Sequence, residues 1–160
     1  MKITTEQVKK LREKCGAGVM ECRQALEAAY AEAPASQKEA EAKALEIIKE
    51  KGLKVAEEKK ERATTQGVIE CYSHSNGRVV SVVELLCETD FVARNEEFRA
   101  VAHELAMQVA AMKPQSVEEL LKQAYIREPN IVAADLINGL VAKIRENIHI
   151  GRIARFELGE

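Results

Sequence analysis

Apolar residues recur at helical spacing along the first third of the chain, which predicts short amphipathic helices. The first helix has clear signals at both ends. Thr4 and Gln7 match a capping box, in which each side chain bonds the main-chain N–H of the other residue. Gly16 predicts the end of this helix, because glycine readily adopts the left-handed conformation found at helix ends.

Two further helices are expected in the same region. The second begins near Val19, and Pro34 marks the loop that follows it. The third runs through an Ala- and Glu-rich stretch and is expected to end at Gly52. Residues 1–52 are therefore predicted to form a three-helix module. Its apolar area is limited, which is typical of a partner-docking module, and the alternative is a folded cap without a partner.

A charged segment follows this module. Residues 53–66 include the run from Glu57 to Arg62, in which acidic and basic side chains alternate. We interpret the segment as a solvent-exposed linker, either helical or extended, that leads to a second domain at 67–160.

Two stretches rich in β-branched residues, 67–74 and 78–87, flank the dipeptide Asn76-Gly77. This dipeptide is preferred at the centre of a type I′ hairpin turn, where both residues need positive φ. We therefore expect two antiparallel strands. The turn predicts a register that pairs the following residues: Cys71 with Val82, and Ile69 with Glu84.

Helices are predicted between this hairpin and the end of the chain. Asn95 is a good N-cap. It precedes an apolar stripe that is expected to pack on the sheet and consists of Phe98, Val101, Ala102, Leu105, Ala106 and Val109. Ser116 and Glu119 match a second capping box, Pro129 is expected to end that short helix, and Asn130 is expected to cap a longer one.

The last residues, 148–160, predict a third strand, in which Ala154, Phe156 and Leu158 alternate with charged residues. The predicted fold class is therefore α+β: a three-helix module followed by a small antiparallel three-stranded sheet with helices on one side. A sheet of this size leaves two open edges, and an open edge can pair with a second copy of the chain.

Composition and charge narrow the range of functions. The 160 residues carry a formal net charge of −2, which argues against a general nucleic-acid-binding protein. No apolar stretch is long enough to cross a bilayer, and the charged N-terminus has no signal-peptide core, so a cytoplasmic protein that does not bind membranes is expected.

Cysteine and histidine give no sign of a metal site. The four cysteines form no C-x-x-C pair, and we expect reduced thiols that serve as small apolar groups. The alternative is a thiol enzyme that uses Cys71 or Cys87. The histidines are scattered, and His103 is expected to face solvent.

The connection between the second strand and the Asn95 helix contains the candidate chemistry. Thr89, Asp90, Phe91 and Val92 lie there, ahead of the apolar stripe. A rigidly held phenylalanine can anchor an interface, and an aspartate beside it can repel phosphate oxygens or compete for a magnesium ion. The alternative is that Phe91 plugs the space under its own helix and that Asp90 bonds nearby amides.

Four segments together resemble bacterial translation elongation factor Ts. They are LREKCGAGVMECRQAL, EKGLKVAEEK, VELLCETDFVARNEEF and KIRENIHIGRIARFELGE, and they span nearly the whole chain. The resemblance is to the compact form with one copy of the core. It implies a ubiquitin-associated-like N-terminal module and guanine-nucleotide exchange on the GTPase elongation factor Tu, from which GDP is released. It implies no covalent chemistry, no enzyme activity, no cofactor and no bound metal.

The resemblance also implies roles for particular residues. Residues 89–92 would disturb the magnesium site of the GTPase, with Phe91 as the inserted side chain. Leu11, Val19 and Met20 would form the docking surface of the N-terminal module. A single core copy leaves the sheet edge unpaired, so a homodimer through the C-terminal domain is expected. The rival interpretation is a binding module for ubiquitin-like or nascent-chain ligands, with no effect on nucleotide exchange.

Overall fold

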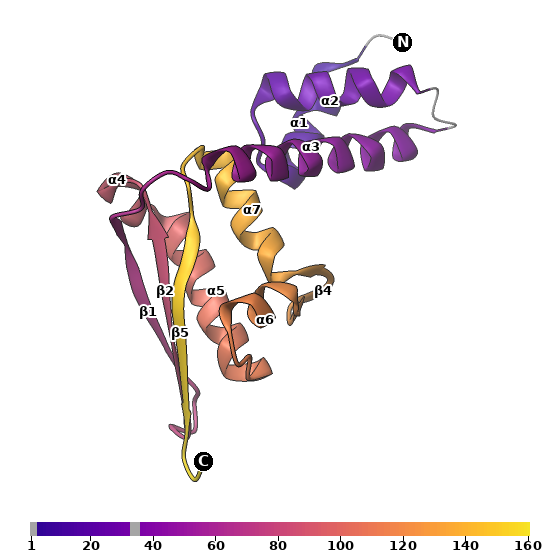
Figure 1. Cartoon of the computed structure of the whole chain (residues 1–160). Coiled ribbons are helices and arrows are strands. Elements are labelled where there is room, and N and C mark those ends of the chain that lie inside the picture. Colours follow the sequence, from indigo (N-terminus) through magenta and orange to yellow (C-terminus); the bar gives the residue numbers. More distant parts are fainter. Residues whose placement is uncertain (1–2, 33–35) are drawn as a thin grey trace.

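The computed structural model describes residues 3–32 and 36–160, and Pro34, expected to mark a loop, lies outside them. Helices come first along the chain, followed by a mixed region of strands and helices (Figure 1). The α+β fold class is therefore confirmed.

The N-terminal helices begin and end largely where the local signals predict. α1 (Thr5–Cys15) has the capping box, with Gln7 N donating to Thr4 Oγ1 at 3.3 Å and Thr4 N donating to Gln7 Oε1 at 2.8 Å. Gly16, at φ 68°, ends it. α2 (Val19–Ala31) starts as expected. These helices pack with the first half of α3 (Gln37–Lys59) around one buried cluster: Val8, Leu11, Ala17, Cys22, Ala25, Leu26, Ala29, Ala40, Ala44 and Ile48.

The expected helix end at Gly52 is wrong, because α3 continues through this residue to Lys59. A glycine inside a helix costs only about 1 kcal/mol, and here it has a packing role. A Cβ on Gly52 would lie 3.1 Å from the Cβ of Ala142, so the missing side chain allows α3 to approach α7 (Ala133–Ile144) closely. Val55 then packs against the second core. The division into 1–52, 53–66 and 67–160 stays a prediction.

The antiparallel sheet has the strand order β1 (Gln66–Ser73), β2 (Val79–Cys87) and β5 (His149–Glu157). The predicted pairs of Cys71 with Val82 and of Ile69 with Glu84 are confirmed. The predicted type I′ turn is wrong. Gly77 has φ 66°, but Asn76 does not adopt a positive φ. The Asn76 side chain instead accepts a bond from Arg78 N at 3.0 Å, which favours a wider loop.

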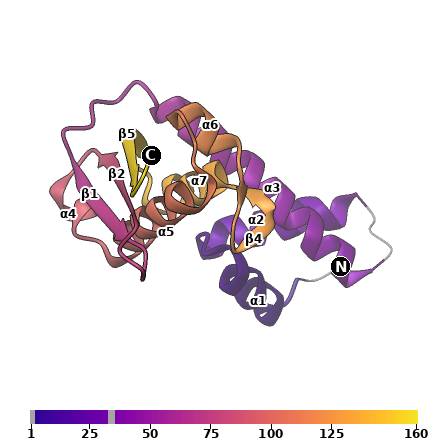
Figure 2. The ribbon, with the colours of Figure 1, turned by 90° about the horizontal axis from the view of Figure 1, so that it is seen from below.

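α5 (Glu96–Met112) lies along one face of this sheet, and α6 (Val117–Lys122) and α7 lie on the same side (Figures 1 and 2). Asn95 caps α5, since its Oδ1 accepts from Glu97 N at 2.8 Å and from Phe98 N at 3.2 Å. The predicted stripe packs on the sheet: Phe98, Ala102, Leu105, Ala106 and Val109 are buried and Val101 is half-buried.

The segment before α7 differs from the expectation, because α6 already ends at Lys122 and Pro129 does not end this helix. Asn130 is not a helix cap, because it lies in β4 (Glu128–Val132), which pairs with β3 (Ala124–Tyr125). Pro129 is tolerated in this short edge strand, where its missing N–H costs no ladder bond. α7 begins three residues later than Asn130, and Asp135 Oδ2 accepts from Val132 N at 3.2 Å at its start.

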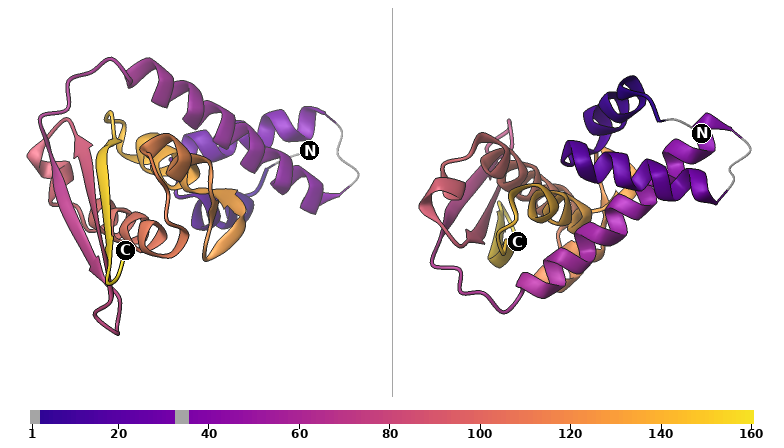
Figure 3. Two further views of the ribbon diagram at one scale, coloured as in Figure 1. Left: turned by 60° about the horizontal axis from the view of Figure 1, so that its bottom comes forward. Right: turned by 90° about the horizontal axis from the view of Figure 1, so that it is seen from above.

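Among the described residues, helices lie on only one face of the β1-β2-β5 sheet (Figure 3). The opposite face is partly apolar, and its exposed side chains include Ile69 and Phe156, which are 61% and 68% exposed. Ala154 and Phe156, the apolar residues of the alternation predicted for β5, thus face solvent. Arg155 between them lies on the helix-covered side, where its Nε donates to Ala110 O of α5 at 3.0 Å.

Candidate functional site

A single helical turn protrudes between β2 and α5. This turn, α4 (Asp90–Ala93), is capped by Thr89, whose Oγ1 accepts from Val92 N at 3.4 Å. Arg94 ends the turn, and Asn95 at once caps α5. Threonine and asparagine both favour cap positions over helix interiors, so this sequence starts two helices in quick succession. The result is a short, well-defined corner at the end of the sheet.

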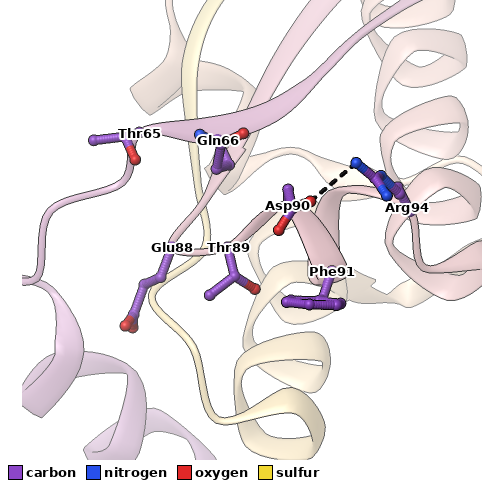
Figure 4. A pocket seen from close by; sticks show the side chains of 7 residues that line it. All are labelled: Thr65, Gln66, Glu88, Thr89, Asp90, Phe91 and Arg94. Atoms are coloured by element: carbon purple, nitrogen blue, oxygen red, sulfur yellow. Dashed lines mark ion pairs between the residues drawn. The ribbon is translucent and has the colours of Figure 1, made fainter.

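Of the four expected site residues, Phe91 is exposed, Val92 is buried, and Thr89 and Asp90 are half-buried. Phe91 is 81% exposed, and Figure 4 shows its ring pointing away from the sheet. Val92 is 9% exposed and belongs to the core. Phe91 therefore does not plug the space under its own helix, which was the alternative open from the sequence.

Asp90 lies beside the exposed ring. Its carboxylate forms an ion pair with Arg94, at 2.9 Å between Oδ2 and Nη2 (Figure 4). The Asp90 side chain is 46% exposed and that of Arg94 is 74% exposed. Exposed pairs of this kind contribute about 0–1 kcal/mol, so the carboxylate can exchange its partner at little cost.

The protrusion borders an open hollow of about 550 Å³. Its lining is mainly polar and comprises Thr65, Gln66, Glu88, Thr89, Asp90, Phe91 and Arg94 (Figure 4). In the parts of the chain that the structure describes, no cluster of His, Cys, Asp and Glu could hold a metal ion. The Phe91 ring and the Asp90 carboxylate are both accessible from solvent beside this hollow.

Glu146, which sequence reasoning missed, holds the base of the protrusion. Its Oε2 accepts from the main-chain N–H of Glu88 and of Thr89, each at 3.1 Å. Its Oε1 accepts from Thr89 Oγ1 at 2.6 Å. The one sequence signal was a polar run, Arg-Glu-Asn, between an apolar helix and an apolar strand. Because 57 residues separate Glu146 from Thr89, no local pattern links them.

The thiol beneath the protrusion is unsuited to nucleophilic chemistry. Cys87 is buried, and its Sγ donates to Thr89 O at 3.2 Å. Burial raises the pKa of Cys87 to about 11, and the nearby Glu146 carboxylate adds to this effect. A thiol with this pKa stays protonated near neutral pH, and only the thiolate is a strong nucleophile.

The predicted docking residues of the N-terminal module have different environments. Val19 and Met20 are 52% and 64% exposed and line a groove of about 280 Å³ between α1 and α2. Basic side chains, including Lys9 and Arg12, lie along the same groove. Leu11 is 0% exposed, because its side chain fills the module's core. It can support this surface only from beneath.

Comparisons with known proteins agree on one family. The family model described as "Elongation factor TS" matches residues 88–160, which include α4, α5 and Glu146. The elongation factor Ts of Carboxydothermus hydrogenoformans is 37% identical over an alignment of 203 positions, gaps included, which covers 99% of this chain and 90% of the relative. That of Oleidesulfovibrio alaskensis is 38% identical and covers 98% of each chain. That of Thermotoga maritima is 36% identical, covering all of this chain and 98% of the relative.

Proposed function

Because the chain belongs to the elongation factor Ts family, and is thus a translation elongation factor, we propose that it is the nucleotide-exchange factor of elongation factor Tu. It binds the GDP-bound GTPase and promotes release of GDP, so that GTP can bind. One observation carries this proposal: Phe91 is 81% exposed on a capped helical turn that the core holds in place.

The proposed mechanism acts on the magnesium ion of the GTPase. In GTPases of this class, Mg²⁺ neutralises phosphate charge and is held by a phosphate-loop hydroxyl and an acidic residue. Phe91 enters an apolar gap near this site and stabilises a shifted conformation. The Asp90 carboxylate then lies where it competes for the ion or repels phosphate oxygens. Because factor and nucleotide each weaken the binding of the other, the coupling is reciprocal.

The energy required is modest. A 1000-fold faster release needs about 4 kcal/mol of differential stabilisation. A buried aromatic anchor supplies about 2 kcal/mol or more, and loss of the ion's attraction for GDP supplies the remainder. No covalent bond is made or broken, so the proposed activity needs no catalytic residue and no cofactor.

The other two residues of the segment have supporting roles in this proposal. Thr89 caps α4 and bonds Glu146, while Val92 anchors the turn in the core. Together they determine the direction in which Phe91 points. This division leaves Asp90 and Phe91 as the residues that touch the partner.

The N-terminal module provides a second contact. Val19 and Met20, with the adjacent groove, form the proposed docking surface, and Leu11 supports it from the core. Two linked contacts raise the overall affinity, because binding of the first brings the second to a high local concentration.

We also propose a homodimer through the C-terminal domain. The uncovered sheet face, with Ile69 and Phe156 exposed, supports it, as do the unpaired outer edges of β1 and β5. The cytoplasm is the expected location, and neither nucleic acid nor membrane is expected as a partner. In the described residues, none of the helices is both long and apolar enough to span a membrane.

The first prediction tests the wedge. Phe91→Ala should slow the stimulated release of fluorescent GDP from elongation factor Tu about 30-fold, because it removes an anchor worth about 2 kcal/mol. Met112→Ala is the control, since that apolar side chain is 45% exposed at the end of α5 that lies away from the protrusion. It should leave the maximal rate unchanged.

Two results would contradict the proposal. Equal rates for wild type and Phe91→Ala would reject the wedge. Binding of wild type to the GTPase without faster GDP release would favour the binding-module interpretation.

A further inference from the structure

We propose that three consecutive residues, Arg145, Glu146 and Asn147, form a positioning loop that fixes the docking module relative to the Phe91 protrusion. The loop joins α7 to β5. Between them, its residues bond the base of the protrusion, the end of α3 and α2. In Figure 1, α2 and α4 both lie at the end of the molecule away from the C terminus. The inference rests on the proposed function in so far as both surfaces touch one partner.

Glu146 fixes the protrusion. Three donors converge on its carboxylate: the N–H groups of Glu88 and Thr89 and the hydroxyl of Thr89. Bonds to an ionised acceptor are roughly twice as strong as neutral ones. The same Thr89 oxygen accepts from Val92 N within α4. Glu146 therefore orients the cap of the turn that carries Phe91.

Asn147 ties the protrusion to the end of α3. Its main-chain N donates to Glu88 Oε1 at 2.6 Å. Its side-chain Nδ2 donates to two carbonyls just beyond α3, Lys60 O at 3.2 Å and Arg62 O at 2.7 Å. Asn147 is 5% exposed, and a buried amide is costly to leave unpaired. These bonds connect the segment just after α3 to Glu88, which lies between β2 and α4.

Arg145 reaches the docking module itself. Its Nη2 lies 3.3 Å from Glu21 Oε2, and Glu21 directly follows the exposed Met20 on α2. Its carbonyl accepts a bond from Lys59 Nζ at the end of α3. Arg145 has φ 67°, a conformation that a residue with a Cβ adopts at a cost, so its surroundings must stabilise it.

The three residues thus set one geometry for two surfaces. A partner that touches both gains affinity only when their separation matches its own binding sites. The maximal exchange rate depends on how Phe91 is aimed, whereas the affinity depends on how well both contacts form together. Glu146 therefore governs the maximal exchange rate, and Arg145 governs the affinity.

Kinetics separate the two roles. Glu146→Ala should lower the maximal rate of GDP release about tenfold and leave the half-saturating concentration nearly unchanged, because the turn is no longer aimed. Glu146→Gln should recover part of the rate, since its amide oxygen can still accept the main-chain bonds. Arg145→Ala should raise the half-saturating concentration about threefold, as expected for loss of a partly exposed ion pair, with the maximal rate unchanged.

Arg127→Ala is the control, because Arg127 forms a comparable ion pair with Glu104, at 2.8 Å, away from both surfaces. It should behave as wild type. A double-mutant cycle of Arg145→Ala with Glu21→Gln should be non-additive, because both variants remove the same pair. Additive effects, or unchanged kinetics for Glu146→Ala, would overturn the inference.

A measurement without the partner separates this inference from the proposed function. A melting curve first checks that the Glu146→Ala variant is folded. In this variant, the amide protons of Glu88 and Thr89 should exchange faster with solvent than in wild type. In Arg145→Ala, ¹⁵N relaxation should show α1 and α2 moving more freely relative to the core. Unchanged exchange and relaxation would reject the positioning loop even if GDP release is stimulated. Both changes would support it even if wild type leaves GDP release unaltered.

Discussion

Phe91 and Val92 are neighbours on one helical turn and meet opposite environments. A step of one residue along a helix rotates the side chain by about 100°. The capped start of α4 therefore decides which of the two faces solvent. Val92 packs in the core, and Phe91 is left exposed to solvent.

The second prediction contrasts these two residues. Val92→Ala should destabilise the fold by about 1–2 kcal/mol, because two buried methyl groups are lost. Phe91→Ala should change stability by less than about 0.5 kcal/mol, since its ring is exposed. Urea unfolding of both variants measures this. A larger loss for Phe91→Ala would mean that the ring packs on its own fold.

The third prediction concerns acid stability at the end of β5. Hydrogen bonds from Lys113, and next from Arg155, lower the pKa of Glu157 to about 2. Because the pKa of Glu157 is lower in the folded protein than its ordinary value of 4.5, the ionised carboxylate stabilises the fold fully at pH values above 4.5. This stabilisation is lost as the pH falls from 4.5 toward 2. The melting temperatures of wild type and Glu157→Gln should therefore differ at pH 6 and converge on acidification. A constant difference would argue against the low pKa.

At the scale of elements, α3 belongs to both halves of the molecule. Its first half packs in the N-terminal cluster through Ala40 and Ala44, and its second half crosses α7 at Gly52. The continuous helix therefore connects the two cores directly. The first half of the charged run, Glu57 to Lys59, thus lies in the last turn of this packed helix. A solvated helix side and a free linker have similar compositions, so the sequence alone does not separate them.

The fourth prediction tests this crossing. Gly52→Leu should destabilise the protein by about 1–3 kcal/mol, because the new side chain meets Ala142 across a packed interface. Gly139→Ala on α7 is the matched control. A Cβ there meets nothing within 4 Å, so it should stabilise the helix by about 0.5–1 kcal/mol. Thermal unfolding of both variants measures whether each one is less or more stable than wild type. A Gly52→Leu variant more stable than wild type would contradict the close packing of α3 against α7.

At the scale of the whole molecule, the uncovered sheet face bears on assembly. Apolar side chains on this face stay exposed in a single copy, with Phe156 68% and Ile69 61% exposed. Burial of about 25 cal/mol per Å² of apolar surface favours covering such a face. Each copy in a dimer would keep its own protrusion, so one dimer would offer two partner sites.

The fifth prediction is the mass in solution. Sedimentation at micromolar concentration should give about twice the chain mass of 17.8 kDa. Phe156→Asp should shift the equilibrium to monomer, because a carboxylate is costly to bury in an apolar interface. A wild-type monomer under these conditions would reject the dimer.

Local interactions made much of this fold predictable from the sequence alone. The capping box at Thr4 and the cap at Asn95 depend on residues within one turn, and the hairpin register depends on one short loop. The apolar stripe of α5 depends only on helical period. In each case, the residues that decide the structure are neighbours in the chain, so their pattern is visible in the sequence.

Tertiary structure decided the features on which the proposed function depends. Gly52 continues a helix because α7 packs against it, and Leu11 is buried because α1, α2 and α3 close around it. Glu146 holds Thr89 although the two positions are 57 apart in the sequence. Such contacts form only when separate elements meet in space, and the free energy of that packing outweighs the local preferences that a sequence displays.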